Sequence, residues 1–210
     1  MELRAEVRAL YEDVEAFQPY NEQEAADKEV ILSALAADSY VAERSAQAHL
    51  ACSVWTVDPS FEQTLLVYHN IYDSWSWIGG HADGEFDLAA VALRELEEET
   101  GVHGRLVSFD GAGRPQPCGN GSGRSHFVFS VEVLTVDGHE KRGVYVSSHL
   151  HLNVTYLAVA NPAEPLRTKP DENSGVRCAP LEDAVRLSTE PWIRERIYRK
   201  LIDKLALMRA

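Results

Sequence analysis

The chain has 210 residues, of which 45% are hydrophobic and 25% are charged, and these values are typical of a folded globular protein of one domain. It carries 20 Lys and Arg against 33 Asp and Glu, a formal net charge of -13. Proteins that bind nucleic-acid backbones or anionic membranes usually carry the opposite sign, so bulk nucleic-acid binding and membrane attachment are disfavoured. A small nucleotide held through a metal ion remains compatible with this charge.

Three widely spaced cysteines, Cys52, Cys118 and Cys178, form neither a zinc-binding spacing nor an even-numbered disulfide framework. We therefore expect reduced thiols and a cytoplasmic protein. The first residues lack the apolar core of a secretory signal, and no apolar run approaches the ~18 residues of a membrane span, so we expect neither.

The N-terminal segment predicts two helices that form an extension ahead of the main domain. Apolar residues recur every three or four positions from 2 to about 17, and Pro19 ends this pattern. A second helix is expected over about 21–36. We assign residues 1–44 to this extension, which is expected to pack on the domain or to build a homodimer contact, and residues 45–210 to the main domain.

From about residue 49 onward, short strands mix with a few helices, which favours a mixed α/β architecture over regular βαβ winding. Polar or glycine-rich connections are expected at 111–123, 138–143 and 162–174. Helices are expected from 87 to 100, closed by Gly101 as a C-terminal cap, and from 192 to 208 at the end of the chain. Strands are expected at about 49–57, 64–68, 105–109, 127–136 and 150–159, and a short one begins at 176.

The stretch from Gly79 to Val102 is the most informative part of the chain. Each helical residue turns by about 100°, so Glu95, Glu98 and Glu99 share one helix edge beside an apolar face. Three carboxylates placed there repel one another unless a cation is bound, and their oxygen atoms suit Mg²⁺ or Mn²⁺. A solvated acidic face is the alternative, and it is the more common outcome for a bare run of glutamates.

The residues around the glutamates favour the metal site. Gly79 and Gly80 allow a close approach of the backbone, and the carbonyl of Gly80 is a candidate further ligand. Arg94 stands directly before the first of the three glutamates, where it could orient a carboxylate.

With these features the sequence resembles the Nudix hydrolase family. The box of that family reads Gly, five residues, Glu, seven residues, and then Arg-Glu-aliphatic-any-Glu-Glu-any-Gly-aliphatic. Residues 94–102 match the second half without a gap, and Gly80 precedes them at the family's spacing. The departure is Phe86, which occupies the position of the first glutamate, with Glu85 beside it. The Gly-Gly-His-Ala-Asp-Gly form that begins at Gly79 is similar to a bacterial Nudix subgroup.

The resemblance implies an α/β/α sandwich with a mixed β-sheet, in which the box at 79–102 is a loop-helix-loop. It implies an enzyme that hydrolyses a diphosphate linkage in a nucleoside-diphosphate-linked or related organic substrate by means of a metal-activated water. Glu98 and Glu99 would be the main ligands of Mg²⁺ or Mn²⁺. Glu95 would be a further ligand or the general base, and Gly80 would offer its carbonyl.

Further candidates lie outside the helix. Similar Nudix enzymes draw an additional ligand or base from a glutamate outside the box, and Glu172 is the candidate here, with an ordinary loop residue as the alternative. His81 follows the glycine pair, while His149 and His151 share one face of a strand, and all three either contact the substrate or serve local roles. Trp75, Trp77 and Tyr72 could stack on a nucleobase, with core packing as the favoured role of Trp77. No cysteine or carboxylate spacing supports a second, zinc-type site.

Two other functions are weighed against hydrolysis. Isopentenyl-diphosphate isomerases share the fold and a variant box but need a cysteine in an Asn-x-x-Cys setting, which Cys52 lacks. A non-catalytic Nudix-like nucleotide sensor usually loses box glutamates, and all three are present here. The chemical group that the diphosphate carries is not encoded in any pattern of the sequence.

Overall fold

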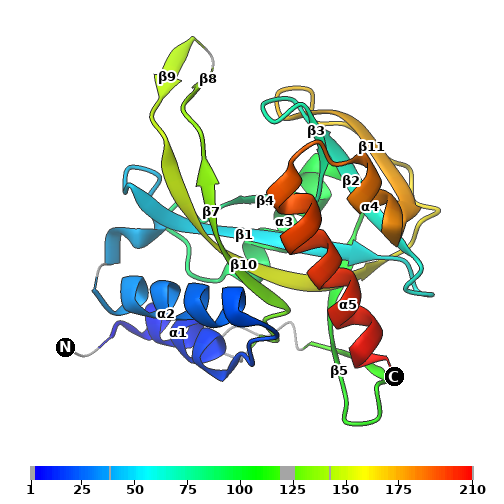
Figure 1. Ribbon diagram of the computed structural model, residues 1–210, viewed down its shortest axis with the longest axis horizontal. Coiled ribbons are helices and arrows are strands. Elements are labelled where there is room, and N and C mark those ends of the chain that lie inside the picture. The colour runs from blue at the N-terminus through cyan, green and yellow to red at the C-terminus, as the bar shows by residue number, and fades with distance from the viewer. Residues whose placement is uncertain (1–2, 38, 119–125, 142, 210) are drawn as a thin grey trace.

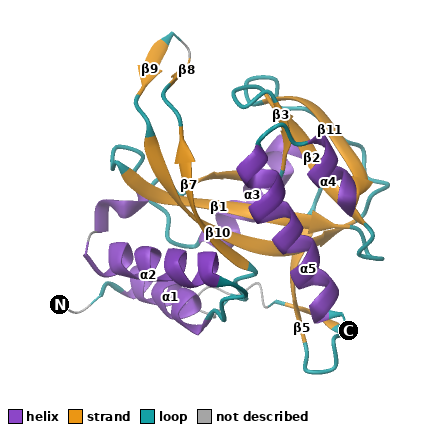
Figure 2. Ribbon diagram, in the orientation of Figure 1, coloured by secondary structure: helices purple, strands orange, loops and turns teal. Residues whose placement is uncertain are grey.

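The computed structural model describes residues 3–37, 39–118, 126–141 and 143–209. Within these residues the fold is a mixed α/β sandwich in which helices cover both faces of a nine-stranded sheet, which confirms the predicted fold class (Figure 1). The two N-terminal helices lie side by side at one side of the molecule. The short strands at residues 139–141 and 144–146 project from its body (Figure 2).

The elements follow the predicted order with some additions. The helices are α1 (Ala5–Ala16), α2 (Glu22–Ala37), α3 (Leu88–Thr100), α4 (Leu181–Leu187) and α5 (Arg199–Met208), with the 3-10 helix η1 (Ser39–Ala42) and the π-helical turn η2 (Ile193–Tyr198). The strands are β1 (Ala48–Val57), β2 (Gln63–His69), β3 (Ser74–Ser76), β4 (Ile78–His81), β5 (Gly104–Phe109), β6 (Pro115–Pro117), β7 (Ser130–Val136), β8 (His139–Lys141), β9 (Val144–Val146), β10 (His149–Ala160) and β11 (Asn173–Pro180).

Three expected connections contain strand residues instead. The one at 162–174 ends early, because β11 already begins at Asn173. The connection at 138–143 contributes β8, which pairs with β9 as a separate two-stranded sheet. The glycine-rich segment at 111–123 contributes β6, although its residues 119–123 lie outside the described residues. Short strands of this kind form because a neighbouring strand supplies hydrogen-bond partners. These partners cannot be predicted from the local sequence alone.

The central strands of the sheet are β1 and β10. They run parallel, with Ala48 beside Leu150 and Val57 beside Val159, while the other pairs of the main sheet are antiparallel. The order is β11-β2-β1-β10-β5-β6, and β3, β4 and β7 pair with β2, β1 and β10. All positions of β1 after Ala48 are buried, as expected for a strand covered on both faces.

Two apolar cores lie on opposite faces of this sheet. The first contains side chains of α1, α2 and α3, such as Val14, Leu35 and Leu96. The second contains side chains of α4, η2 and α5, and Leu201 of α5 packs there with Trp55 of β1. The N-terminal helices therefore pack on the main core, while the division at residue 44 stays a prediction.

A buried ionic network ties the N-terminal extension to the C-terminal helix. Lys204 Nζ lies 2.7 Å from Glu24 Oε1, and Lys200 Nζ lies 2.9 Å from Glu132 Oε1 and 3.2 Å from Glu24 Oε1. All four side chains are at most 4% exposed. Buried charges are tolerated only when paired, so this network fixes how α2, β7 and α5 meet.

Helix α3 begins and ends as its sequence predicts. The side chain of Asp87 accepts a hydrogen bond from the Ala90 backbone N–H at 3.0 Å, and Gly101 adopts a left-handed conformation with φ 76°. These caps fix which residues of α3 face the sheet. Among the described residues, none of the helices combines the length and the apolar character needed to cross a membrane.

Candidate active site

The first residues of the box, Gly79 to His81, belong to strand β4 rather than to the expected loop, because they pair with β1. The glycine pair of this strand brings helix α3 against the sheet. In the antiparallel pairing of β4 with β1, Gly79 lies opposite Ser53 and Gly80 lies opposite Cys52. A Cβ atom added at Gly80 would lie 2.5 Å from Glu95 Cδ, and one added at Gly79 would overlap the carbonyl oxygen of Cys52. Only glycine leaves room for Glu95 at this place, as the sequence predicts for a close approach.

Three carboxylates converge next to this glycine pair. One oxygen atom from each of Glu95, Glu99 and Glu172 lies within 4.8 Å of the others. Glu99 is 2% exposed, and its Oε1 accepts a hydrogen bond from the Gly79 backbone N–H at 3.3 Å. The structure thus brings two of the three box glutamates together with the glutamate expected from outside the box.

Burial and mutual repulsion disfavour the charged forms of these carboxylates, and a bound cation would offset both effects. Burial, reinforced by the charges of Glu95 and Glu172, raises the pKa of Glu99 to about 8. Burial also raises the pKa of Glu95 above its ordinary value. Carboxylate oxygens are the donors that Mg²⁺ and Mn²⁺ prefer, so the three converging side chains fit the expected ion.

A lysine that sequence reasoning missed lies over the same cluster. Lys169 Nζ is 3.0 Å from Glu98 Oε2, 3.1 Å from Glu172 Oε2 and 4.0 Å from Glu95 Oε2. Burial opposes its charge, but the hydrogen bonds to Glu98 and Glu172 outweigh burial and raise the pKa of Lys169 above its ordinary value. Lys169 is therefore a protonated ammonium group among carboxylates.

Glu98 and Arg94 lie at the outer rim of this site. Glu98 is about half exposed, and its carboxylate pairs with Lys169 rather than with the converging group. Arg94 makes a bidentate pair with Glu85, at 2.6 Å and 3.3 Å. Phe86, which replaces the box's first glutamate, is buried in the core. The carboxylate that pairs with Arg94 is thus that of Glu85, the residue before Phe86.

The segment before β11 is docked on α3 by a buried asparagine. Asn173 Nδ2 donates to the Glu99 carbonyl oxygen at 3.0 Å, and Asn173 Oδ1 accepts from the Lys169 backbone N–H at 3.2 Å. Asn173 is fully buried. It therefore places Glu172 and Lys169 over the helix, a long-range contact that no local pattern announces.

A cavity of about 150 Å³ opens beside the carboxylate cluster. Glu95, Glu99 and Glu172 line one part of it, and other parts are lined by Arg44 and Lys141. Diphosphates bind where metal ligands and cationic side chains face one space, so the cavity can hold such a group.

Of the three aromatic candidates, Trp77 and Tyr72 line the cavity, whereas Trp75 lies elsewhere. Trp75 lies in β3 among Tyr68, whose ring centroid is 5.5 Å away, and Arg177, whose guanidinium is 5.3 Å from the ring. It is not among the described residues that line the cavity. His69, which the sequence did not single out, also lines the cavity and stacks on Tyr72, with ring centroids 4.4 Å apart.

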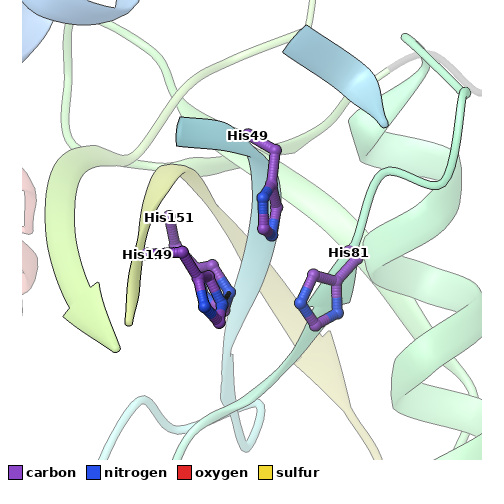
Figure 3. Close-up of side chains that lie close together, drawn as sticks. All are labelled: His49, His81, His149 and His151. Atoms are coloured by element: carbon purple, nitrogen blue, oxygen red, sulfur yellow. Dashed lines mark hydrogen bonds between the residues drawn. The ribbon is translucent and has the colours of Figure 1, made fainter. Parts of the chain in front are cut away.

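The predicted histidines come together with one that the sequence did not single out. His81, His149 and His151 surround His49 of β1 (Figure 3). Burial lowers the pKa of His81 to about 3 and that of His151 to about 2, so both rings are neutral near neutral pH. His81 and His151 also line the cavity.

A sequence model of the NUDIX domain matches residues 47–201. A search of curated proteins found no match to the chain. Similar solved structures include a NUDIX-family hydrolase from Clostridium perfringens, with 18% identity and a TM-score of 0.49 over 76% of this chain and 97% of that chain. Others are an Ap4A hydrolase binary complex from C. elegans (17%, TM-score 0.46, 75% and 95% covered) and a MutT NUDIX hydrolase from Burkholderia pseudomallei (15%, 0.43, 76% and 98%).

Proposed function

The chain belongs to the NUDIX domain family, and from this premise we propose that it hydrolyses a diphosphate linkage in a nucleoside-diphosphate-linked or related organic substrate with the help of Mg²⁺ or Mn²⁺. The observation that carries the proposal is the convergence of Glu95, Glu99 and Glu172 beside Gly80. These carboxylates are oxygen donors in a partly buried cavity, and a bound divalent cation would compensate their charge.

The residues divide the work between holding the ion and moving a proton. Glu95, Glu99, Glu172 and the carbonyl of Gly80 would hold the ion, with Glu98 joining from the rim. Once bound, the ion would neutralise the diphosphate and acidify the attacking water. Of the carboxylates, Glu95 and Glu172 are the candidates for the general base, because each has a carboxylate oxygen at the converging group and is more exposed than the buried Glu99.

Cationic and aromatic side chains would hold the substrate. Lys169 can donate to a phosphate oxygen from the carboxylate side, while Arg44 and Lys141 line other parts of the cavity. The stacked rings of His69 and Tyr72 offer an apolar surface for a planar group on the substrate.

The isomerase alternative is disfavoured by the only cysteine among the described residues that line the cavity. Burial raises the pKa of Cys52 to about 12, so its thiol stays protonated and weakly reactive at neutral pH. A sensor without catalysis is disfavoured because the three glutamates of the box helix, Glu95, Glu98 and Glu99, are kept. Three free thiols fit the expected cytoplasmic location, and the homodimer stays a prediction.

A substrate panel with added metal tests the proposal. Purified protein would be incubated with sugar nucleotides, dinucleoside polyphosphates and nucleoside triphosphates in the presence of Mg²⁺ or Mn²⁺. We expect a phosphomonoester product from at least one class, no product with a chelator, and recovery when the metal is restored. Turnover that persists unchanged in the chelator would contradict the proposal.

A further inference from the structure

Four histidines from three strands lie on one face of the sheet. In the parallel pairing of β1 with β10, His49 lies beside His151. His81 lies opposite Ala51, which is two residues after His49 and so points to the same face. His149 precedes His151 by two residues and shares its face. The strand register therefore gathers side chains that are far apart in the sequence.

The ring nitrogens of these histidines lie at metal-ligand spacing. One nitrogen from each of the four lies within 4.8 Å of the others, and His149 Nε2 is 3.2 Å from His151 Nε2. Two imidazoles bound tetrahedrally at about 2.05 Å from a zinc ion have nitrogens ~3.3 Å apart. The pair in β10 is therefore already at the separation of two ligands of one ion.

His49 is the most informative member of the group. It is 2% exposed, and its Nε2 is buried with no hydrogen-bond partner in the described part of the chain. Its Nδ1 lies 2.8 Å from the Ala46 carbonyl oxygen, which fixes the proton on Nδ1 and leaves a lone pair on Nε2. Figure 3 shows its ring directed toward the other three.

Backbone carbonyls orient a second ring in the same way. His149 Nδ1 lies 2.8 Å from the Ser147 carbonyl oxygen, so its Nε2 also presents a lone pair to the group. Metal-bound histidines characteristically donate their other N–H to such an outer partner. Arg44, a cation close enough to act on the histidine charges, is paired with Asp83 at 2.6 Å, which reduces its repulsion of a bound cation.

We propose that His49, His81, His149 and His151 bind one divalent transition-metal ion of the zinc class, at a site separate from the carboxylate cluster. Neutral imidazoles suit Zn²⁺ and its neighbours, whereas Mg²⁺ prefers oxygen ligands, so ligand chemistry sorts two different ions into two sites. The bound ion would fasten β1, β4 and β10 together. His81, His149 and His151, which the sequence analysis offered as substrate contacts, would then bind an ion instead.

The test uses the full chain without an affinity tag. Protein stripped with a chelator is titrated with Zn²⁺, and its metal content is measured after gel filtration. We expect one tightly held zinc per chain and a higher Tm in zinc, because an ion that binds only the folded state stabilises it. Co²⁺ in place of Zn²⁺ should give the visible absorption of a nitrogen-ligated site.

Ligand variants locate the ion. His149→Ala and His151→Ala should weaken zinc affinity by at least ~10-fold, since even the loss of an outer-shell partner has an effect of this size. The matched control is His103→Ala, because His103 is exposed and pairs with Glu97 and Glu164 outside the group. This control should bind zinc as the wild type does.

Three results would overturn the proposal. The first is a wild-type chain that retains no zinc, and the second is unchanged zinc affinity in both ligand variants. The third is loss of zinc in Glu99→Gln with retention in the histidine variants, which would place the ion at the carboxylates.

X-ray absorption of the zinc-loaded wild type decides the matter if the variants do not fold. Four nitrogens at ~2.0 Å are expected, and a shell of oxygen ligands would contradict the site. If the chain retains zinc but hydrolyses no substrate, the zinc site stands and only the proposed function is contradicted.

Discussion

The backbone of Gly80 lies directly against the carboxylate of Glu95, so that even one methyl group at position 80 would come within 2.5 Å of Glu95 Cδ. The position of a candidate metal ligand thus depends on the absence of a side chain on the neighbouring strand.

Gly80→Ala should displace Glu95 and lower kcat by ~10²-fold, because catalytic groups tolerate little misplacement. The measurement is steady-state kinetics on the substrate that the panel identifies. Gly111→Ala is the matched control, since a Cβ at Gly111 meets nothing within 4 Å and its φ is not positive. Equal loss in both variants would show that the effect is general rather than local.

Glu99→Gln should lower turnover by ~10²-fold or more, because the substitution removes one ligand charge from the proposed ion while keeping the side-chain shape. Glu97→Gln lies on the same helix but is exposed to solvent, and it should retain wild-type turnover. The variants should be compared across a range of Mg²⁺ concentrations. Similar turnover in Glu99→Gln and Glu97→Gln would remove Glu99 from the site.

Lys169→Gln should lower the Mg²⁺ concentration needed for half-maximal activity several-fold. The ammonium group lies 3.1 Å from Glu172 and 4.0 Å from Glu95, so it competes with a divalent cation for the same carboxylates. A metal titration of activity measures this shift, and isothermal titration calorimetry measures it without substrate. A higher Mg²⁺ requirement in the variant would mean that Lys169 supports metal binding instead.

Lys200→Met should destabilise the fold by on the order of 3 kcal/mol, because it leaves the buried carboxylate of Glu132 without its cation. Urea unfolding followed by circular dichroism measures the change. Arg199→Met, which removes an exposed pair with Glu195 on the same helix, should change stability little. If the two variants were equally stable, the buried network would not hold the extension in place.

Sequence patterns predict the parts of this site that are local. The three-and-four spacing of α3 and the cap at Gly101 are properties of one continuous segment, so the edge that carries Glu95 and Glu99 can be read directly. Asn173 and Lys169 reach α3 from about seventy residues away, and such pairings exist only after folding. The role of Glu98 as a ligand and the substrate contacts of Trp75 stay predictions.

The histidine group likewise depends on contacts that form only on folding. The alternation of His149 and His151 predicts a shared strand face, which their side chains have. His49 joins them only because β1 and β10 run parallel in one register, with His49 beside His151. Without that register, the sequence contains four separate histidines and no ligand spacing.

Gly80 and His81 are consecutive residues of β4, one adjoining the carboxylates and the other belonging to the histidine group. Because neighbouring strand residues point to opposite faces, deleting or inserting one residue in this strand would turn both the wrong way at once. A change in chain length is therefore expected to do less harm after Ala82, in the turn that contains Glu85, the partner of Arg94. The turn between β4 and α3 can therefore gain or lose a residue, whereas strand β4 cannot.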